Sequence, residues 1–220
     1  MSARFVVVAI DGGAASGKST TAYALAKNLN FLHVDTGSHY RAVCHAMLKI
    51  GVHADQEELV SHLDKLVLET LVKDNQAIVC IEGQELADAD LRSEKVNELV
   101  SHFAARSSVR NKLLAYQRGQ VEVALTKGLS GLAIEGRDIG SVIFPEADVK
   151  VFLKAEQRER ERRRSAEGGI DSIGKRDEMD TLRKNAPLSC PSDAFIIDTV
   201  EYNINGVIDL ITELVSKARS

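Results

Sequence analysis

Aromatic residues, proline and cysteine are all scarce in this sequence of 220 residues. It contains no tryptophan, three prolines and three cysteines, and aromatic residues make up 5% of it. The cysteines, Cys44, Cys80 and Cys190, are odd in number, widely spaced and form no CxxC pair. We therefore expect reduced thiols in a cytoplasmic protein. The six histidines show no metal-ligand spacing either, so none is assigned to a metal site.

Long apolar runs and an excess of basic residues are also missing. The longest apolar run is far too short to cross a bilayer, and the first residues lead directly into a predicted strand. We therefore expect neither a membrane span nor a signal peptide. A net charge of −4 argues against a surface that binds nucleic acid or membranes. A hydrophobic content of 44% is enough for one substantial domain with small insertions.

A glycine-rich motif stands near the N-terminus. Residues 10–20 read IDGGAASGKST and fit the pattern G-x-x-x-x-G-K-[ST]. Glycine lets the backbone wrap tightly enough for several N–H groups to converge on phosphate oxygens. Lys18 can reach the β- and γ-phosphates of a nucleotide, and the Ser19 hydroxyl is placed to ligate Mg²⁺. The residues predicted to bind ATP are Gly12, Gly13, Ala14, Ala15, Ser16, Gly17, Lys18, Ser19 and Thr20.

The residues around this motif support a phosphate-binding role. Residues 5–10 are continuously apolar, as expected for a strand that is buried on both faces. After the motif, apolar residues recur with helical spacing at Ala22, Leu25, Ala26 and Leu29. The motif therefore joins a strand to a helix, and the N-terminus of that helix favours an anion. The alternative, a chance match in a glycine-containing loop, would not have this context.

Further apolar segments predict an α/β fold with an open parallel sheet. The other core strands are expected at residues 31–34, 132–134, 149–153 and 195–197. Between Ala54 and Arg92 the pattern changes to a short helix and two strands around a turn at residues 74–76. We interpret this region as a small antiparallel insertion beside the main sheet.

Charged residues follow the ends of two predicted strands. Residues 135–140 read EGRDIG and place Arg137 next to Asp138 directly after the strand at 132–134. Ligands of open parallel sheets collect at the carboxyl ends of strands, and an arginine can bind phosphate through two N–H groups. Arg41 stands in a predicted helix near the end of the strand at 31–34. The alternative for Arg137 and Asp138 is a surface ion pair in a loop.

An arginine-rich run follows the predicted strand at 149–153. Residues 157–164 read QRERERRR, and Arg160 and Arg164 share one face of a helix. Such a run usually forms a solvated helix face with i,i+4 ion pairs. Its excess of positive charge also suits a mobile segment that closes over polyphosphate. Residues 165–174, which contain several glycines, are expected to be the flexible part of that segment.

Three further charged residues recur on one helix face after this run. They are Arg176, Asp180 and Arg183, at positions i, i+4 and i+7. One interpretation is a ladder of ion pairs along the helix, in which each pair contributes about 0.2–0.5 kcal/mol. The other is a clamp on a sugar and its phosphate.

In this order, these stretches resemble the bacterial cytidylate kinase family nearly from end to end. The glycine-rich motif alone occurs in many families. The sequence Gly-Arg-Asp-Ile-Gly followed by the Arg/Asp/Arg helix face is far more specific to this family. The matching residues are Ile10–Thr20, Asp35–Gly37, Tyr40–Arg41, Val109–Arg110, Glu135–Gly140, Phe144–Pro145, Ala147–Asp148, Glu159–Arg160, Arg163–Arg164, Arg176–Asp177, Asp180, Arg183 and Ala186–Leu188.

The resemblance implies a three-layer α/β P-loop kinase fold. Such a fold has a five-stranded parallel sheet, a small antiparallel insertion that binds the nucleoside monophosphate (NMP), and a LID segment. On this sequence we expect a single kinase domain at residues 1–220, with its core at residues 1–53, 108–155 and 186–220. The NMP-binding insertion is expected at about residues 54–107, and the LID at about residues 156–185.

The same resemblance assigns the residues that bind CMP. The CMP phosphate would be held by Arg41, Arg137 and Arg183. The cytosine would be read by Ser101, Arg110 and Asp138. The pentose hydroxyls would be bound by Arg176 and Asp180, and Asp35 would lie near the acceptor phosphate and the waters of the metal. Arg160 would be a LID arginine that reaches the transferring phosphoryl group. The expected catalytic residues are Lys18, Arg137, Arg160 and Arg183.

The implied reaction is ATP- and Mg²⁺-dependent phosphorylation of CMP and dCMP, in pyrimidine nucleotide metabolism. The resemblance also implies a cytoplasmic monomer, with neither nucleic acid nor membrane as a partner. Two departures from the family pattern stand out. The family usually has proline where this chain has Gly13, and the segment between Arg164 and Arg176 is shorter than expected. The second departure leaves the extent of the LID open.

Three other interpretations stay open. A kinase of a different monophosphate or metabolite would keep the glycine-rich loop at residues 12–20, the phosphate loop, but not the cytosine contacts. A regulatory nucleotide switch is a more distant alternative: the sequence has no Asn-Lys-x-Asp motif, and no acidic residue clearly ends a long apolar strand. A nucleic-acid-binding module built on residues 158–164 is opposed by the acidic balance and the lack of interleaved aromatic residues.

Overall fold

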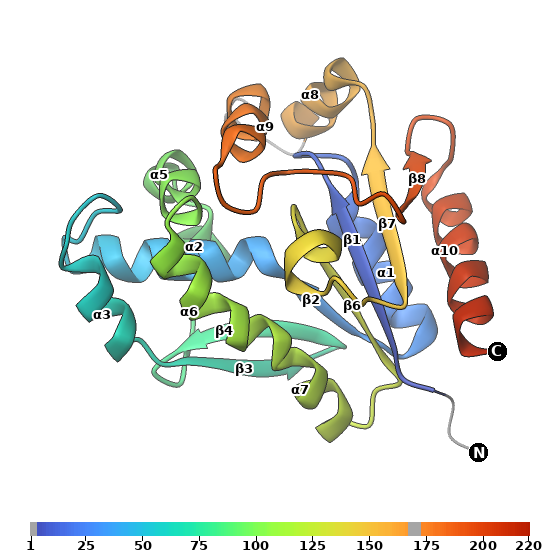
Figure 1. Ribbon diagram of the computed structural model, residues 1–220, viewed down its shortest axis with the longest axis horizontal. Coiled ribbons are helices and arrows are strands. Elements are labelled where there is room, and N and C mark those ends of the chain that lie inside the picture. The colour runs from blue at the N-terminus through green and yellow to red at the C-terminus, as the bar shows by residue number, and fades with distance from the viewer. Residues whose placement is uncertain (1–3, 167–172) are drawn as a thin grey trace.

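One sheet of eight strands organises the part of the chain described by the computed structural model, residues 4–166 and 173–220 (Figure 1). The strands are β1 (Val6–Gly12), β2 (Leu32–Asp35), β3 (Leu68–Lys73), β4 (Gln76–Ile81), β5 (Gln84–Glu85), β6 (Gly131–Gly136), β7 (Val149–Lys154) and β8 (Phe195–Asp198). Their order is β3-β4-β2-β6-β1-β7-β8, with β5 paired to β4. The neighbours β2, β6, β1, β7 and β8 run parallel, which confirms the predicted five-stranded parallel sheet.

Helices connect these strands and cover the sheet. The helices are α1 (Lys18–Leu29), α2 (Thr36–Lys49), α3 (Leu59–Lys65), α4 (Asp88–Leu91), α5 (Glu94–Ala104), α6 (Ser107–Arg118), α7 (Gln120–Thr126), the π-helix η1 (Ile139–Ile143), α8 (Gln157–Ala166), α9 (Ile173–Leu182) and α10 (Ile204–Arg219). The strand–loop–helix unit predicted around the glycine-rich motif is confirmed as β1 and α1.

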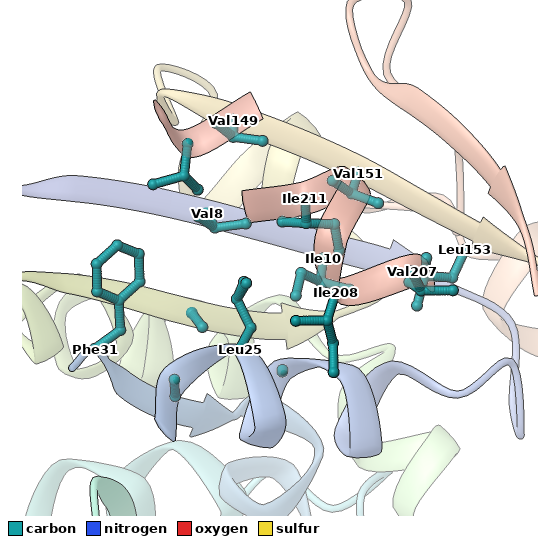
Figure 2. Close-up of a cluster of buried hydrophobic side chains, with 14 of the residues drawn as sticks. Val8, Ile10, Leu25, Phe31, Val149, Val151, Leu153, Val207, Ile208 and Ile211 are labelled. Carbon is teal, nitrogen blue, oxygen red and sulfur yellow. The ribbon is translucent and has the colours of Figure 1, made fainter. Parts of the chain in front are cut away.

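Strand β1 has apolar residues on both faces because both faces of the sheet are covered. Val8 and Ile10 pack with Leu25 of α1 and Ile211 of α10 (Figure 2). Ala9 belongs to a second buried cluster, which includes residues of α7 and η1. Successive side chains of a strand point to opposite faces, so the continuous apolar run is the pattern that two covering layers require. The result is the predicted three-layer α/β arrangement.

The antiparallel hairpin β3–β4 forms where the sequence predicts it. Its turn residues, Asp74 and Asn75, have φ values of +47° and +62°, which aspartate and asparagine tolerate better than most residues. However, the hairpin continues the main sheet rather than lying beside it. His33 N donates to Asn75 O at 2.7 Å, and β4 pairs in parallel with β2 at His33 and Gln76. The boundaries of core, insertion and LID stay a prediction.

A second core lies beside the sheet, among helices α2, α3, α5 and α6. It is built from side chains such as Val43, Leu63, Phe103 and Leu113, each at most 2% exposed. This packing fixes the relative positions of α5 and α6, the two helices that carry the predicted base-reading residues. The carboxyl ends of β1 and β7 point toward α8 and α9, which lie above them in Figure 1.

Two predictions concern parts of the chain outside the sheet. Residues 167–172, most of the segment predicted to be flexible, lie outside the described residues. Over residues 4–166 and 173–220, no helix combines the length and apolar character that crossing a bilayer requires.

Candidate active site

The loop between β1 and α1 has the tightly wound backbone that its glycines predict. Gly12 has a φ of +152°, and a Cβ atom there would lie 2.2 Å from the carbonyl oxygen of Leu153 on β7. Ala15 and Gly17 also have positive φ values, of 55° and 91°. Left-handed residues within a turn bring backbone N–H groups toward a common centre, which makes the loop suited to bind an anion.

Lys18, the first residue of α1, folds back over this loop. Its Nζ donates to the carbonyl oxygen of Gly13 at 2.6 Å. Burial, together with the positive charge of Arg137, lowers the pKa of Lys18 to about 7. A polyphosphate next to the ammonium group would oppose both effects, because an opposite charge favours the charged form of an amine.

Ser19, the predicted magnesium ligand, contacts an acidic residue that ends a core strand. Its Oγ donates to Glu135 Oε2 at 2.9 Å, and His33 Nε2 lies 2.9 Å from Glu135 Oε1. Glu135 is only 2% exposed at the end of β6. The sequence showed no acidic residue that clearly ends a long apolar strand, and in the structure Glu135 takes this place at the end of a short one. The run before Glu135 is short, but all of it is buried, because β6 lies between β1 and β2.

The residues at this point of the loop fit a magnesium ion. Mg²⁺ keeps several waters and binds proteins through one or two oxygen ligands plus substrate phosphates. Ser19 offers a hydroxyl oxygen, and Glu135 offers a carboxylate beside it. In the part of the chain that the structure describes, no group of three or more His, Cys, Asp or Glu residues could hold a metal by itself.

Asp11 of β1 organises the EGRDIG segment. Its two carboxylate oxygens accept hydrogen bonds of 2.8 Å from the backbone N–H groups of Ile139 and Gly140, which begin η1. Burial raises the pKa of Asp11 to about 6, although the two N–H groups oppose this shift. Turns with π-type hydrogen bonding often occur at functional sites. Here the turn sets the direction in which Arg137 and Asp138 leave β6.

Arg137, Asp180 and Arg183 form one cluster next to the phosphate loop. Arg137 Nε donates to Asp180 Oδ2 at 2.8 Å, and its Nη1 donates to Gly12 O at 2.8 Å. Arg183 Nη1 lies 3.7 Å from Asp180 Oδ1. Arg183 Nη2 is buried and has no hydrogen-bond partner among the described residues. Burial lowers the pKa of Arg183, so an anion at this nitrogen would satisfy both its charge and its donor.

The predicted base-reading residues come from three elements. Arg110 of α6 and Asp138, after β6, form a buried ion pair. The Arg110 guanidinium lies over the Tyr40 ring, 5.3 Å from its centroid, and Arg110 Nη1 donates to Ala104 O at 3.2 Å. Burial raises the pKa of Asp138, and Arg110 opposes this shift. Ser101 of α5 is also buried and lines the same cleft as Asp138.

Arg41 and Asp35 lie near the N-terminus of α2. Arg41 is buried, and its Nη1 donates to Leu91 O at 2.9 Å and to Asn97 Oδ1 at 2.7 Å. Asp35 caps α2, because its carboxylate accepts a hydrogen bond of 2.8 Å from Gly37 N. Asp35 and Arg41 both line the cleft, together with Arg92, which the sequence did not single out.

The LID arginine predicted at position 160 contacts the phosphate loop itself. Arg160 Nη1 donates to Ala14 O at 3.0 Å and pairs with the carboxylate of Asp177 on α9. Asp177 Oδ1 in turn accepts a hydrogen bond of 2.9 Å from Ala14 N. The simpler interpretation of the basic run holds for Arg162 and Arg163, which pair with Glu159 on α8. The side chain of Arg176 lies outside the part that the structure describes.

A single cleft contains most of the predicted site. It is lined by residues of the phosphate loop, of the strand ends, of the insertion and of the segment around α9. The predicted residues along it are Ala14, Ala15, Ser16, Gly17, Lys18, Ser19, Thr20, Asp35, Arg41, Ser101, Arg137, Asp138, Asp180 and Arg183. Arg110 lines a neighbouring cavity and reaches this cleft through Asp138.

Besides Arg92, further residues join the site without having been assigned a role from the sequence. They include Asp11, His33, Glu135 and Asp177. Asp11, Glu135 and Asp177 belong to motifs that the sequence singled out, so their place in those motifs was a partial signal. Nothing in the sequence pattern distinguishes His33 from the other histidines, because its partner is 102 residues away along the chain.

Comparison with known proteins shows that the chain is similar to cytidylate kinases over nearly its whole length. The model of the cytidylate kinase family matches residues 8–217. The chain is 40% identical to the cytidylate kinase of Geobacillus sp. strain WCH70 over 222 residues, which cover 96% of each protein. It is 36% identical to the cytidylate kinase of Chloroherpeton thalassium over 238 residues, covering 97% of this chain and 96% of that one.

A solved structure shares the fold. This chain resembles the crystal structure of an uncharacterised protein from Eubacterium ventriosum with a TM-score of 0.51, at 14% sequence identity. The similarity covers 97% of this chain and 99% of that protein. The fold is therefore shared with a protein of low sequence identity. Together with the full-length match to the family model, the full-length relatives show that the chain belongs to the cytidylate kinase family of phosphotransferases, which phosphorylate CMP and dCMP.

Proposed function

We propose that this cytidylate kinase transfers the γ-phosphoryl group of ATP directly and in line to the phosphate of CMP or dCMP, with Mg²⁺ as the cofactor. The observation that carries the proposal is the contact between the two halves of the cleft. Arg137 Nη1 donates to Gly12 O at 2.8 Å, so the arginine cluster lies directly beside the loop that would hold ATP. A donor and an acceptor bound on either side of this contact would have their phosphates adjacent.

The donor side is the loop from Gly12 to Thr20. Its backbone N–H groups would bind the β- and γ-phosphates, and Lys18 would exchange its contact with Gly13 O for phosphate oxygens. Mg²⁺, held by Ser19 and the ATP phosphates, would supply positive charge that offsets the charge of the transferring group.

The acceptor side is the arginine cluster with its neighbours. Arg41, Arg137 and Arg183 would bind the CMP phosphate. This role is supported by the buried Nη2 of Arg183, which has no partner within the described part of the chain. The cytosine would lie against Ser101 and the Arg110–Asp138 pair. The pentose hydroxyls would contact Asp180 and Arg176, and Asp35 would lie near the acceptor phosphate.

Catalysis in this arrangement depends on holding the two reacting phosphates in line and on placing positive side chains around the transferring phosphoryl group. A CMP phosphate oxygen is already an anionic nucleophile at neutral pH, so no strong general base is needed. Lys18, Arg137, Arg160 and Arg183 would stabilise the negative charge spread over the transferring phosphoryl group. Arg160 already touches the loop at Ala14 O, a contact that supports its role as the LID arginine. Closure of the LID would exclude water and so suppress hydrolysis of ATP.

The setting of the reaction is also a proposal. We propose a cytoplasmic monomer whose partners are ATP and CMP or dCMP. The free thiols of Cys44, Cys80 and Cys190 support a reducing compartment. The net charge of −4 supports the absence of nucleic-acid and membrane partners.

Formation of ADP from ATP and Mg²⁺ tests the proposal, with CMP, dCMP, UMP, AMP, GMP and dTMP offered in turn. Activity confined to CMP and dCMP, far above a control without acceptor, is the expected result. Activity with another monophosphate would keep the phosphate loop and remove the roles of Ser101, Arg110 and Asp138. Equal turnover with and without these acceptors would favour a kinase of another metabolite or a regulatory nucleotide switch instead.

A further inference from the structure

Both carboxylate oxygens of Glu135 have a partner from a different element of the fold. Oε1 lies 2.9 Å from His33 Nε2 on β2, and Oε2 accepts a hydrogen bond of 2.9 Å from Ser19 Oγ on α1. Glu135 is 2% exposed and His33 is 7% exposed, so water has little access to either contact. A buried carboxylate that is bound at both oxygens keeps one orientation.

The sheet places the histidine next to the carboxylate. His33 lies opposite Ala133 in the parallel pairing of β2 with β6, two residues before Glu135. Because side chains alternate along a strand, His33 and Glu135 point to the same face of the sheet, the face covered by α1. The ring of Tyr23 on α1 meets the imidazole at an angle of 63°, with 6.0 Å between centroids. The imidazole is therefore held between α1 and the carboxylate.

The chemistry of these groups decides where the protons lie. An ionised carboxylate only accepts hydrogen bonds, so His33 Nε2 and Ser19 Oγ must both donate to Glu135. When the hydroxyl proton of Ser19 points at Glu135, the lone pairs of Ser19 Oγ point elsewhere. A hydroxyl ligand binds a metal ion through such a lone pair, so this orientation prepares Ser19 for Mg²⁺. Without His33, the long side chain of Glu135 could turn away from Ser19.

We propose that His33 is a positioning residue for the magnesium site. It holds Glu135 in place, Glu135 takes the hydroxyl hydrogen bond of Ser19, and Ser19 then presents its oxygen to Mg²⁺. His33 itself touches neither the metal nor the nucleotide. The inference rests on one part of the proposed function, the binding of Mg²⁺ with the nucleotide at Ser19. Partners of this kind, which act through a ligand, typically change metal affinity by about 10–100-fold.

The test is equilibrium binding of a non-hydrolysable ATP analogue, AMP-PNP, measured by calorimetry once in excess Mg²⁺ and once in EDTA. We expect His33→Leu to weaken binding about 10-fold in Mg²⁺ and to leave binding in EDTA unchanged. His33→Gln, which can still donate an N–H to Glu135, should recover most of the Mg²⁺-dependent affinity. This conservative variant also keeps the test decisive if His33→Leu does not fold.

A second buried histidine provides a matched control. His39 of α2 is fully buried and packs edge-on against Tyr116, with 4.8 Å between ring centroids, and its ring nitrogens have no partner among the described residues. His39→Leu should leave the difference between Mg²⁺ and EDTA as it is in the wild type. In a Glu135→Gln background, His33→Leu should weaken binding little further. His33 acts through Glu135, and the effects of two residues that act through one another do not add.

Two results would overturn the inference. One is an equal loss of affinity in Mg²⁺ and in EDTA, or no loss, for His33→Leu. The other is an undiminished effect of His33→Leu when Glu135 is already glutamine. Since the assay contains no acceptor, it is independent of CMP phosphorylation. A protein that bound Mg²⁺–AMP-PNP in the expected way but failed to phosphorylate CMP would remove the proposed function and leave this inference standing.

Discussion

The backbone N–H of Ala14 donates a hydrogen bond of 2.9 Å to the carboxylate of Asp177, 163 residues further along the chain. The same carboxylate pairs with Arg160, whose Nη1 also donates to Ala14 O at 3.0 Å. Helices α8 and α9 are thus both attached to the phosphate loop at Ala14. The position of α9 therefore depends on Ala14 and Arg160, two residues that are expected to contact a bound nucleotide.

Loss of the Asp177 charge should loosen α9. In Asp177→Asn the ion pair with Arg160 is gone and the hydrogen bond to Ala14 N is weaker, so we expect faster hydrogen exchange at the backbone amides of α9. Mass spectrometry of deuterated peptides from residues 173–182 measures this. Glu178→Gln removes the same charge from an exposed position of the same helix and should leave exchange unchanged. Equal protection of α9 in both variants would show that the contact does not hold the helix.

Arg183 should be essential for turnover because its Nη2 is buried without a partner among the described residues. We expect Arg183→Ala to lower kcat/KM for CMP by about 100-fold or more, and Arg137→Ala to have a similar effect. Steady-state kinetics with CMP as the varied substrate checks this. Arg162→Ala is the control, since that side chain is 73% exposed and pairs only with Glu159 within residues 4–166 and 173–220. A near-normal kcat/KM in either cluster variant would remove that residue's phosphate role.

Nucleotide binding should take up a proton above neutral pH. Burial and Arg137 lower the pKa of Lys18 to about 7, so at pH 8 the protein without nucleotide holds Lys18 mostly neutral. Phosphate would raise this pKa again, so binding at pH 8 should take up close to one proton, and binding at pH 6 very few. Calorimetry in two buffers with different protonation enthalpies gives this number. Lys18→Met should bind more weakly and show no uptake at pH 8.

Gly12 should tolerate no side chain. A Cβ would lie 2.2 Å from Leu153 O, at a φ of +152°. We expect Gly12→Ala to lower the free energy of unfolding by about 3 kcal/mol or more, through both the clash and the backbone strain. Gly128 has a φ of +70°, but a Cβ atom there would meet no atom of the described residues within 4 Å. Gly128→Ala should therefore cost only about 1 kcal/mol. Urea denaturation compares the two, and similar losses would mean that the contact with β7 has no effect.

Local patterns were enough to predict much of this protein. Continuous apolar residues at 5–10 and helical spacing after Lys18 place the phosphate loop between β1 and α1, because each signal spans only a few residues. The same holds for the five parallel strands. The helix predicted to carry Asp180 and Arg183 on one face ends earlier than expected, at Leu182, so Arg183 lies one residue beyond α9. The order of these motifs also carried the resemblance to the cytidylate kinase family, which the full-length relatives confirm.

Tertiary structure alone decided which distant residues meet. Asp11 reaches Ile139 across 128 residues, and Glu135 reaches both Ser19 and His33 because β6 lies between β1 and β2. The pairing of β4 with β2, which makes the hairpin part of the main sheet, depends on the same strand order. A local pattern determines what a segment becomes and which side chains it carries. The partners of those side chains are set by strand order and helix packing, to which residues far apart in the chain contribute together.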